Sequence, residues 1–144
     1  MTTIVLNTQT GAVSEYSRFD FQALTPTHAG AAVGLFALGG DTDAGEPIVA
    51  ELRTPPALQG ATLKKAMGFV YLAMRGQGLG ELTVFGHAQA WRYQALIAPQ
   101  GMTRFQTGKG VRETYLALGF RNLAGTPFQI DRIEGLTPTS ERRI

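Results

Sequence analysis

A run of alternating apolar and polar residues near the C-terminal end constrains the fold of this chain more than any other feature. Between residues 108 and 136 the sequence reads GKGVRETYLALGFRNLAGTPFQIDRIEGL. Residues two apart on an extended strand share a face, and the apolar ones here are Leu116, Leu118 and Phe120, then Phe128 and Ile130. Asn122–Gly125 separates the two runs and contains residue types that tolerate positive φ. The pattern predicts two strands joined as a hairpin, which is typical of an all-β module.

Length and composition favour one domain made of many short strands. A chain of 144 residues buries roughly 68–70% of its unfolded surface on folding, which is enough for an independent core. Its 18 glycines and 7 prolines supply the frequent turns that short strands need. Further segments that read as strands are 3–6, 13–17, 32–38, 48–53, 82–85, 91–97 and 102–105.

Turn residues between these segments predict further hairpins. Segments 32–38 and 48–53 flank a polar stretch and read as a hairpin with a long tip. Within 48–53, alternation places Ile48, Ala50 and Leu52 inward and Glu51 and Arg53 outward. Gly76–Gly80 reads as a hairpin loop, and residues 24–30 read as an irregular loop.

The region 61–75, ATLKKAMGFVYLAMR, fits two secondary structures. As a helix it would place Leu63, Met67, Val70 and Met74 on one face, with Thr62 as a cap. As a strand, its aromatic and β-branched residues suit a pleated surface. We expect a short helical turn at 62–66 followed by a strand.

The predicted fold is therefore all-β, a single antiparallel β-sandwich that is jelly-roll-like and contains at most one short helix. Residues 1–30 are expected to form an N-terminal strand or arm, residues 31–136 the sandwich, and residues 137–144 a C-terminal arm.

The basic residues are scattered and the net charge is only +2, so we expect no nucleic-acid partner. Cysteine is absent, no apolar run approaches about 20 residues, and the N-terminus lacks a signal-peptide pattern. We therefore expect no membrane insertion.

Candidates for catalysis are few. The serines are Ser14, Ser17 and Ser140, none of which lies in a G-x-S-x-G elbow, and the imidazoles are His28 and His87. Because the spacing of Gly76, Gly78 and Gly80 is G-x-G-x-G with a strand after it, it predicts a turn rather than a phosphate loop. We expect no catalytic residues, no enzymatic activity and no cofactor.

Two groups of residues could bind ligands. Asp41, Asp43 and Glu46 could supply oxygen ligands for Ca²⁺, although the same residues are ordinary at a hairpin tip. Trp91 and Tyr93, together with Tyr115, could form an aromatic ligand surface, although a stripe with a period of two is more often core. Arg112, Arg121 and Arg132 are candidates for ion pairs across the final hairpin with Glu113, Asp131 or Glu134.

A family resemblance covers most of the chain, from Gly34 to Pro138. The sequences GLFALGGDTDAGEPIVAELRTP, LKKAMGFVYLAMRGQG and GKGVRETYLALGFRNLAGTPFQIDRIEGLTP resemble a module of tailed-bacteriophage virion proteins in the tail and baseplate. The positions that carry the resemblance are Leu38–Asp41, Gly45, Pro47, Gly108, Gly110, Arg112, Tyr115, Asn122, Gly125, Phe128 and Asp131. Most are turn and core residues, so the resemblance bears on fold and setting rather than on a reaction.

The resemblance implies a structural component of a phage virion, a tail-tip or baseplate subunit made in the host cytoplasm. Its partners would be other virion proteins and copies of itself, with a trimer as one arrangement. The residues expected at such interfaces are Phe19, Phe21, Arg142 and Arg143. The alternative function is a receptor- or carbohydrate-binding module of the tail, which would contact a host-surface receptor through Trp91 and Tyr93 or through the loops at 41–46 and 76–80.

Overall fold

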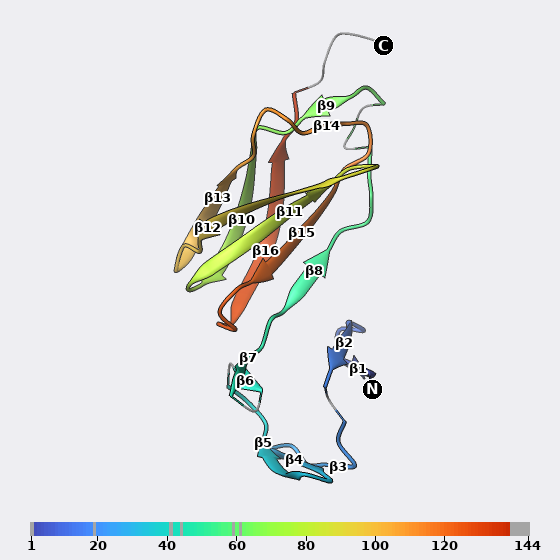
Figure 1. Cartoon of the computed structure of the whole chain (residues 1–144), viewed down its shortest axis with the longest axis vertical. Coiled ribbons are helices and arrows are strands. Elements are labelled where there is room, and N and C mark those ends of the chain that lie inside the picture. Colours follow the sequence, from blue (N-terminus) through green and yellow to red (C-terminus); the bar gives the residue numbers. More distant parts are fainter. Residues whose placement is uncertain are drawn as a thin grey trace. The chain divides into compact units, whose positions relative to one another are not determined.

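The described residues form β-strands joined by turns and loops, and the chain divides into two compact units after Gly40. The structure, a computed structural model, describes residues 2–18, 20–40, 42–43, 45–58, 60 and 62–138. No helix occurs among these residues, and so none that could span a bilayer. Unit 1 comprises Met1–Gly40 and unit 2 comprises Asp41–Ile144. Figure 1 labels the strands of each unit.

Unit 1 consists of two small antiparallel sheets. Strand β1 (Thr2–Leu6) pairs with β2 (Val13–Ser17) as a hairpin. The second sheet is a meander of β3 (Ala23–Leu24), β4 (His28–Ala31) and β5 (Gly34–Ala37). The expectation that residues 24–30 form an irregular loop was therefore wrong, because Leu24 and Ala29 pair across β3 and β4.

Unit 2 is an antiparallel β-sandwich (Figure 1). One sheet has the order β13–β10–β16 and the other the order β12–β11–β15–β8. A two-stranded sheet, β14–β9, and a small hairpin, β6–β7, complete the unit. The bounds are β6 (Thr42–Asp43), β7 (Glu46–Pro47), β8 (Glu51–Arg53), β9 (Lys65–Ala66), β10 (Phe69–Gly76), β11 (Leu79–Phe85), β12 (Ala90–Leu96), β13 (Gln100–Gln106), β14 (Arg112–Glu113), β15 (Ala117–Asn122) and β16 (Phe128–Leu136).

The core lies between the two large sheets. Alternate residues of β10, β11 and β15 point inward and are almost completely buried: Val70, Leu72 and Met74; Leu82 and Val84; Leu118 and Phe120. Phe120 of one sheet meets Phe105 and Phe128 of the other edge to face, with ring centroids 6.2 and 4.9 Å apart. These rings join the two sheets, since such contacts add to the gain from burial. The expected antiparallel β-sandwich is confirmed, and its jelly-roll refinement stays a prediction.

The expected hairpins of unit 2 were wrong in their partners, although their strands exist. β15 pairs with β11 and β8, whereas β16 pairs with β10 in the opposite sheet. β10 and β11 are likewise joined by a short loop but lie in different sheets. β5 pairs with β4, and β8 pairs with β15, so segments 32–38 and 48–53 do not pair with each other. Alternation reports which face of a strand is buried, not which strand lies beside it.

The described part of the region 61–75 contains β9 and, from Phe69 on, β10, so the expected strand exists and the expected helical turn at 62–66 was wrong. Lys65 and Ala66 form β9, whose backbone pairs with Glu113 and Arg112 of β14. The Lys65 side chain is fully buried, and its ammonium group donates to the carbonyl oxygens of Leu63 (3.0 Å) and Thr114 (2.8 Å). These tertiary contacts override local preference, because Leu63, Lys64 and Ala66 are good helix formers.

Asn122 fixes the segment that leads into β8. Its side-chain oxygen accepts from the Ala50 amide at 2.8 Å, and its amide nitrogen donates to the carbonyls of Thr126 (2.8 Å) and Ile48 (3.3 Å). These bonds use the backbone of 48–50, which forms no strand. As a result Ile48 and Ala50 are exposed, contrary to the expected inward placement, and only Leu52 packs on the core.

We predict that Asn122→Ala destabilises unit 2 by about 2 kcal/mol or more. The substitution removes three hydrogen bonds made by a side chain that is only 2% exposed, and each such bond contributes about 0.5–1.5 kcal/mol. Urea unfolding measures the change. Gln129→Ala is the matched control, because the Gln129 side chain is exposed and bonds only Asp131; it should change stability by less than about 0.5 kcal/mol. Equal effects of the two substitutions would contradict this role for Asn122.

Candidate functional site

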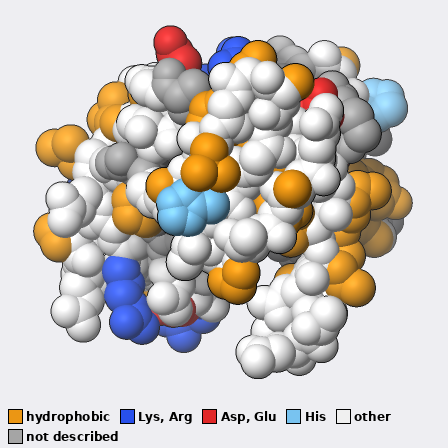
Figure 2. Space-filling view, turned by 90° about the horizontal axis from the view of Figure 1, so that it is seen from below, with side chains coloured by type: hydrophobic (Ala, Val, Ile, Leu, Met, Phe, Trp, Pro, Cys, Tyr) orange, Lys and Arg blue, Asp and Glu red, His pale blue; other side chains and the backbone are white. Residues whose placement is uncertain are grey.

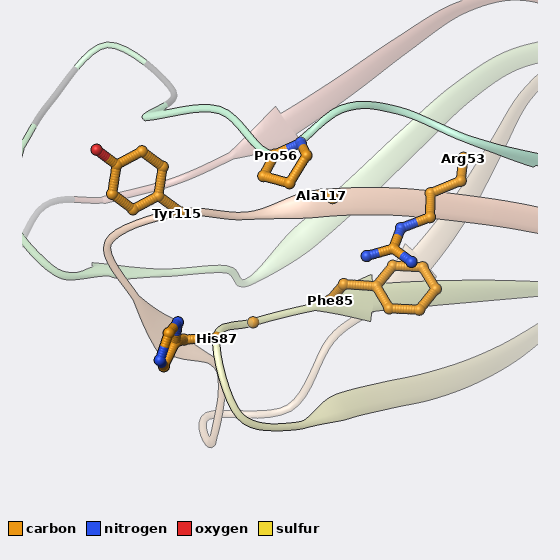
Figure 3. A pocket seen from close by; sticks show the side chains of 7 residues that line it. Arg53, Pro56, Phe85, His87, Tyr115 and Ala117 are labelled. Atoms are coloured by element: carbon orange, nitrogen blue, oxygen red, sulfur yellow. The ribbon is translucent and has the colours of Figure 1, made fainter.

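The candidate site is a shallow pocket of about 300 Å³ in unit 2. It is lined by Arg53, Pro56, Phe85, Gly86, His87, Tyr115 and Ala117. Arg53, Phe85 and Ala117 come from β8, β11 and β15, which are neighbours in the four-stranded sheet. Because Leu52, Val84 and Leu118 next to them point into the core, these side chains lie on the outer face of that sheet. Figure 3 shows Arg53 and Phe85 at one end of the pocket and Tyr115 and His87 at the other.

Arg53 is held by stacking on an aromatic ring. Its guanidinium carbon lies 3.8 Å from the centroid of the Phe85 ring (Figure 3). Gly119 makes this possible, because a Cβ atom at that position would lie 2.9 Å from Cε2 of Phe85. The ring therefore rests on the bare backbone of β15 and Arg53 covers its other side. A cation–π contact of this kind contributes about 0.5–1 kcal/mol at an exposed site.

The other end of the pocket is built from loops that hydrogen bonds hold in place. Ala57 and Leu116 exchange two backbone bonds of 3.0 and 3.1 Å, which keeps Pro56 beside β15. Gly86 donates to the Gln89 carbonyl at 2.9 Å and closes the turn that carries His87. The neighbouring Glu113 side chain lies against Gly86, where a Cβ would come within 2.7 Å of it. Tyr115 is 55% exposed although Leu116 beside it is buried.

A second polar cluster lies on the same outer face of the sheet. The Glu81 carboxylate is nearly buried and lies 2.9 Å from Arg121 and 3.8 Å from Arg92, and it accepts a bond of 3.2 Å from Gln94. The contact between Arg121 and Glu81 Oε1 is short enough for an ion pair. It is not a hydrogen bond, because no described donor meets the hydrogen-bond geometry at Oε1. One carboxylate (−1) faces two guanidinium groups (+2), so the cluster keeps a net positive charge while it links β11, β12 and β15. The expected partners of Arg121 on the last hairpin were wrong. Arg132 pairs with Glu134 at 2.8 Å, but both lie on β16, so this pair does not cross between strands as expected.

The aromatic residues expected at a ligand surface are separated by the structure. Trp91 and Tyr93 lie on the inward side of β12, where they are partly buried and pack on the core. Their packing agrees with the alternative that a stripe with a period of two belongs to the core. A ligand surface formed by these two residues stays a prediction. Tyr115 is turned outward and belongs to the pocket. Arg53 was correctly expected to point outward, but nothing in the sequence indicates that Phe85 and Tyr115 lie beside it.

The remaining candidates are not assembled into a site. Asp43 and Glu46 face each other across the β6–β7 hairpin, and Asp41 lies outside the described residues. No cluster of three metal-ligating side chains occurs in the part of the chain that the structure describes. Gly78 has a φ of +83°, and a Cβ on Gly80 would lie 2.7 Å from the Phe120 ring. The glycines therefore serve a turn, as expected, and also core packing, which the sequence did not indicate.

The expected interface residues lie in the two terminal segments. Phe21 is partly buried and packs on Phe36 of β5, with ring centroids 5.8 Å apart. Phe19, Arg142 and Arg143 lie outside the described residues. Apolar side chains reach the surface elsewhere as well, and Figure 2 shows them in several separate groups. Nothing in the sequence indicated that apolar residues of β1 and β2 would be exposed.

Comparison with known proteins adds no identification. No family model, curated protein or solved structure matches the chain.

We predict that Gly119→Ala displaces the Phe85 ring and lowers stability by about 1–3 kcal/mol, the usual cost of overpacking. The new Cβ would also come within 3.3 Å of the Leu52 carbonyl oxygen. Thermal unfolding measures the loss, and the matched control is Gly108→Ala, where a Cβ meets no atom within 4 Å. If Gly119→Ala were as stable as Gly108→Ala, the account of the Arg53 and Phe85 stack would be wrong.

Proposed function

We propose that this protein is a structural subunit that assembles through unit 1, and that the assembly is the tail tip or baseplate of a phage virion. The supporting observation is the contrast between the two units. Unit 2 buries a continuous core, whereas in unit 1 Ala29 is the single buried apolar residue among those described. The apolar residues of unit 1 are therefore available for a partner.

The β1–β2 hairpin carries the clearest apolar face. Ile4 and Leu6 alternate on β1, and Val13 lies opposite Leu6 in the register of the hairpin. Their exposed fractions are 73%, 59% and 66%. An isolated two-stranded hairpin is marginally stable in water, and burying each such side chain contributes about 1.5–3 kcal/mol. Covering this face would therefore stabilise both the hairpin and the contact.

The β3–β4–β5 meander extends the same argument. Its large exposed apolar residues are Leu24, Val33 and Leu35. Its outer strands, β3 and β5, each pair on one side only, as do both strands of the hairpin. Open edges accept further strands, so both the apolar faces and the backbone favour addition to a neighbouring subunit.

Copies of the chain and neighbouring virion proteins are the partners that this proposal names. The resemblance of residues 34–138 to phage tail and baseplate modules supports the setting. The C-terminal arm is part of the same proposal, although only Thr137 and Pro138 of it are described. The Pro138 carbonyl accepts from the Ala66 amide at 3.2 Å, so the arm leaves the sandwich beside β9.

We predict that the wild-type chain forms oligomers that the triple substitution Ile4→Ser, Leu6→Ser and Val13→Ser dissociates. Losing three buried side chains should raise the dissociation constant at least about 100-fold. Analytical ultracentrifugation over a concentration series measures it. The matched control is Leu96→Ser on β12, which removes a side chain that is 77% exposed on unit 2.

The control should assemble as the wild type does. A wild-type chain that stays monomeric at every concentration would contradict the proposal, as would a triple variant that assembles normally. For the setting, mass spectrometry of purified phage particles should detect the chain among the tail proteins, and its absence from them would refute the virion assignment.

A further inference from the structure

We propose that the pocket between Arg53 and Tyr115 binds an acidic sugar, through its carboxylate and one face of its ring. This site lies within unit 2 and does not depend on assembly through unit 1. Tyr115 was among the aromatic candidates in the sequence, but here it lies apart from Trp91 and Tyr93 and lines a pocket with Arg53, Pro56 and Phe85.

Arg53 supplies a charge that the protein itself leaves available. Four arginines lie within 4.0 Å of a carboxylate: Arg75, Arg92, Arg121 and Arg132. In the described part of the chain the Arg53 side chain has no such partner, and it contacts the Phe85 ring instead. Stacking leaves the edge of the guanidinium plane free, and this edge carries the donors that bind a carboxylate in a bidentate manner.

Tyr115 and Pro56 supply the apolar wall. Tyr115 is 55% exposed at the far end of the pocket from Arg53 (Figure 3). A tyrosine ring offers a flat apolar face together with a hydroxyl at its wet end. In the proposed complex the C–H face of a sugar ring packs on Tyr115, and the sugar's carboxylate points toward the Arg53 end of the pocket. The pocket volume of about 300 Å³ is at the lower end of the range for small-ligand sites, which suits one sugar ring.

The remaining polar groups favour one negative charge and several hydroxyls. Arg53 is the single fixed cation in the pocket lining, and the carboxylate-bearing side chain of Glu113 lies against Gly86 at its edge. A phosphate chain or a nucleic acid carries several negative charges and would need several cations. Sugar hydroxyls, in contrast, donate to a carboxylate and can bond the His87 imidazole. A uronic or sialic acid residue combines these features.

In the test, the full chain is titrated with two acidic probes, trigalacturonate and sialyllactose. Binding is measured by calorimetry and by NMR. We expect saturable binding of at least one probe, with a dissociation constant on the order of 1 mM or tighter. The methyl ester of the bound probe should bind at least about tenfold more weakly. Failure of both probes to bind would overturn the proposal, and so would equal binding of acid and ester.

Variants then assign the site. Arg53→Gln and Tyr115→Ala should each weaken binding at least about tenfold, whereas Tyr115→Phe should retain most of it. Arg104→Gln is the matched control, because Arg104 also lies over a ring, that of Phe69, at 5.5 Å in the opposite sheet. It should bind as the wild type does. Unchanged melting temperatures verify folding, and undiminished binding by folded Arg53→Gln and Tyr115→Ala would refute the site.

Discussion

Packing between the two sheets of unit 2 determines almost everything else in that unit. The inward side chains of β10, β11 and β15 close one core, and the Phe105, Phe120 and Phe128 rings cross from sheet to sheet. Because side chains alternate along a strand, burying one set places the other set outside in a fixed register. The pocket is a consequence: with Leu52, Val84 and Leu118 inside, Arg53, Phe85 and Ala117 meet on the outer face.

The sequence predicts the strands well where burial alone decides them. β12 and β15 can be predicted from their alternation, and β10 from its aromatic and β-branched residues, because a half-buried pleated surface favours such residues. Pairing partners were missed, because a short loop between two strands suits a connection between sheets as well as a hairpin. Lys64 and Lys65 show a similar limit. They are identical in type and adjacent, yet only Lys65 is buried and bonds the Thr114 carbonyl.

The candidate site could be predicted only in part. Tyr115 was identifiable as an aromatic candidate, and the outward direction of Arg53 follows from alternation. The stack of Arg53 on Phe85 depends on Gly119, which is 34 residues beyond Phe85 and leaves room for the ring. No local pattern reports such a contact. Asn122 likewise sets the path of residues 48–50 through bonds to a segment that is distant in sequence.

Function follows from the difference between the two units. Unit 2 buries a continuous apolar core and, in the proposed site, leaves the Arg53 guanidinium and the Tyr115 ring for a ligand. Unit 1 has open edges and exposed apolar faces, and it gains stability when another chain covers them. In this proposal unit 2 folds by itself and unit 1 is covered by a neighbouring subunit, an arrangement that suits repeated assembly.

Amide hydrogen exchange across a dilution series tests this division most directly. Amides of β10, β11 and β15 should be protected at every concentration, because their core needs no partner. Amides of β1 and β2 should become protected only at concentrations where the chain oligomerises. Strong protection of β1 and β2 in a dilute monomer would contradict the account, because it would show that unit 1 needs no second chain.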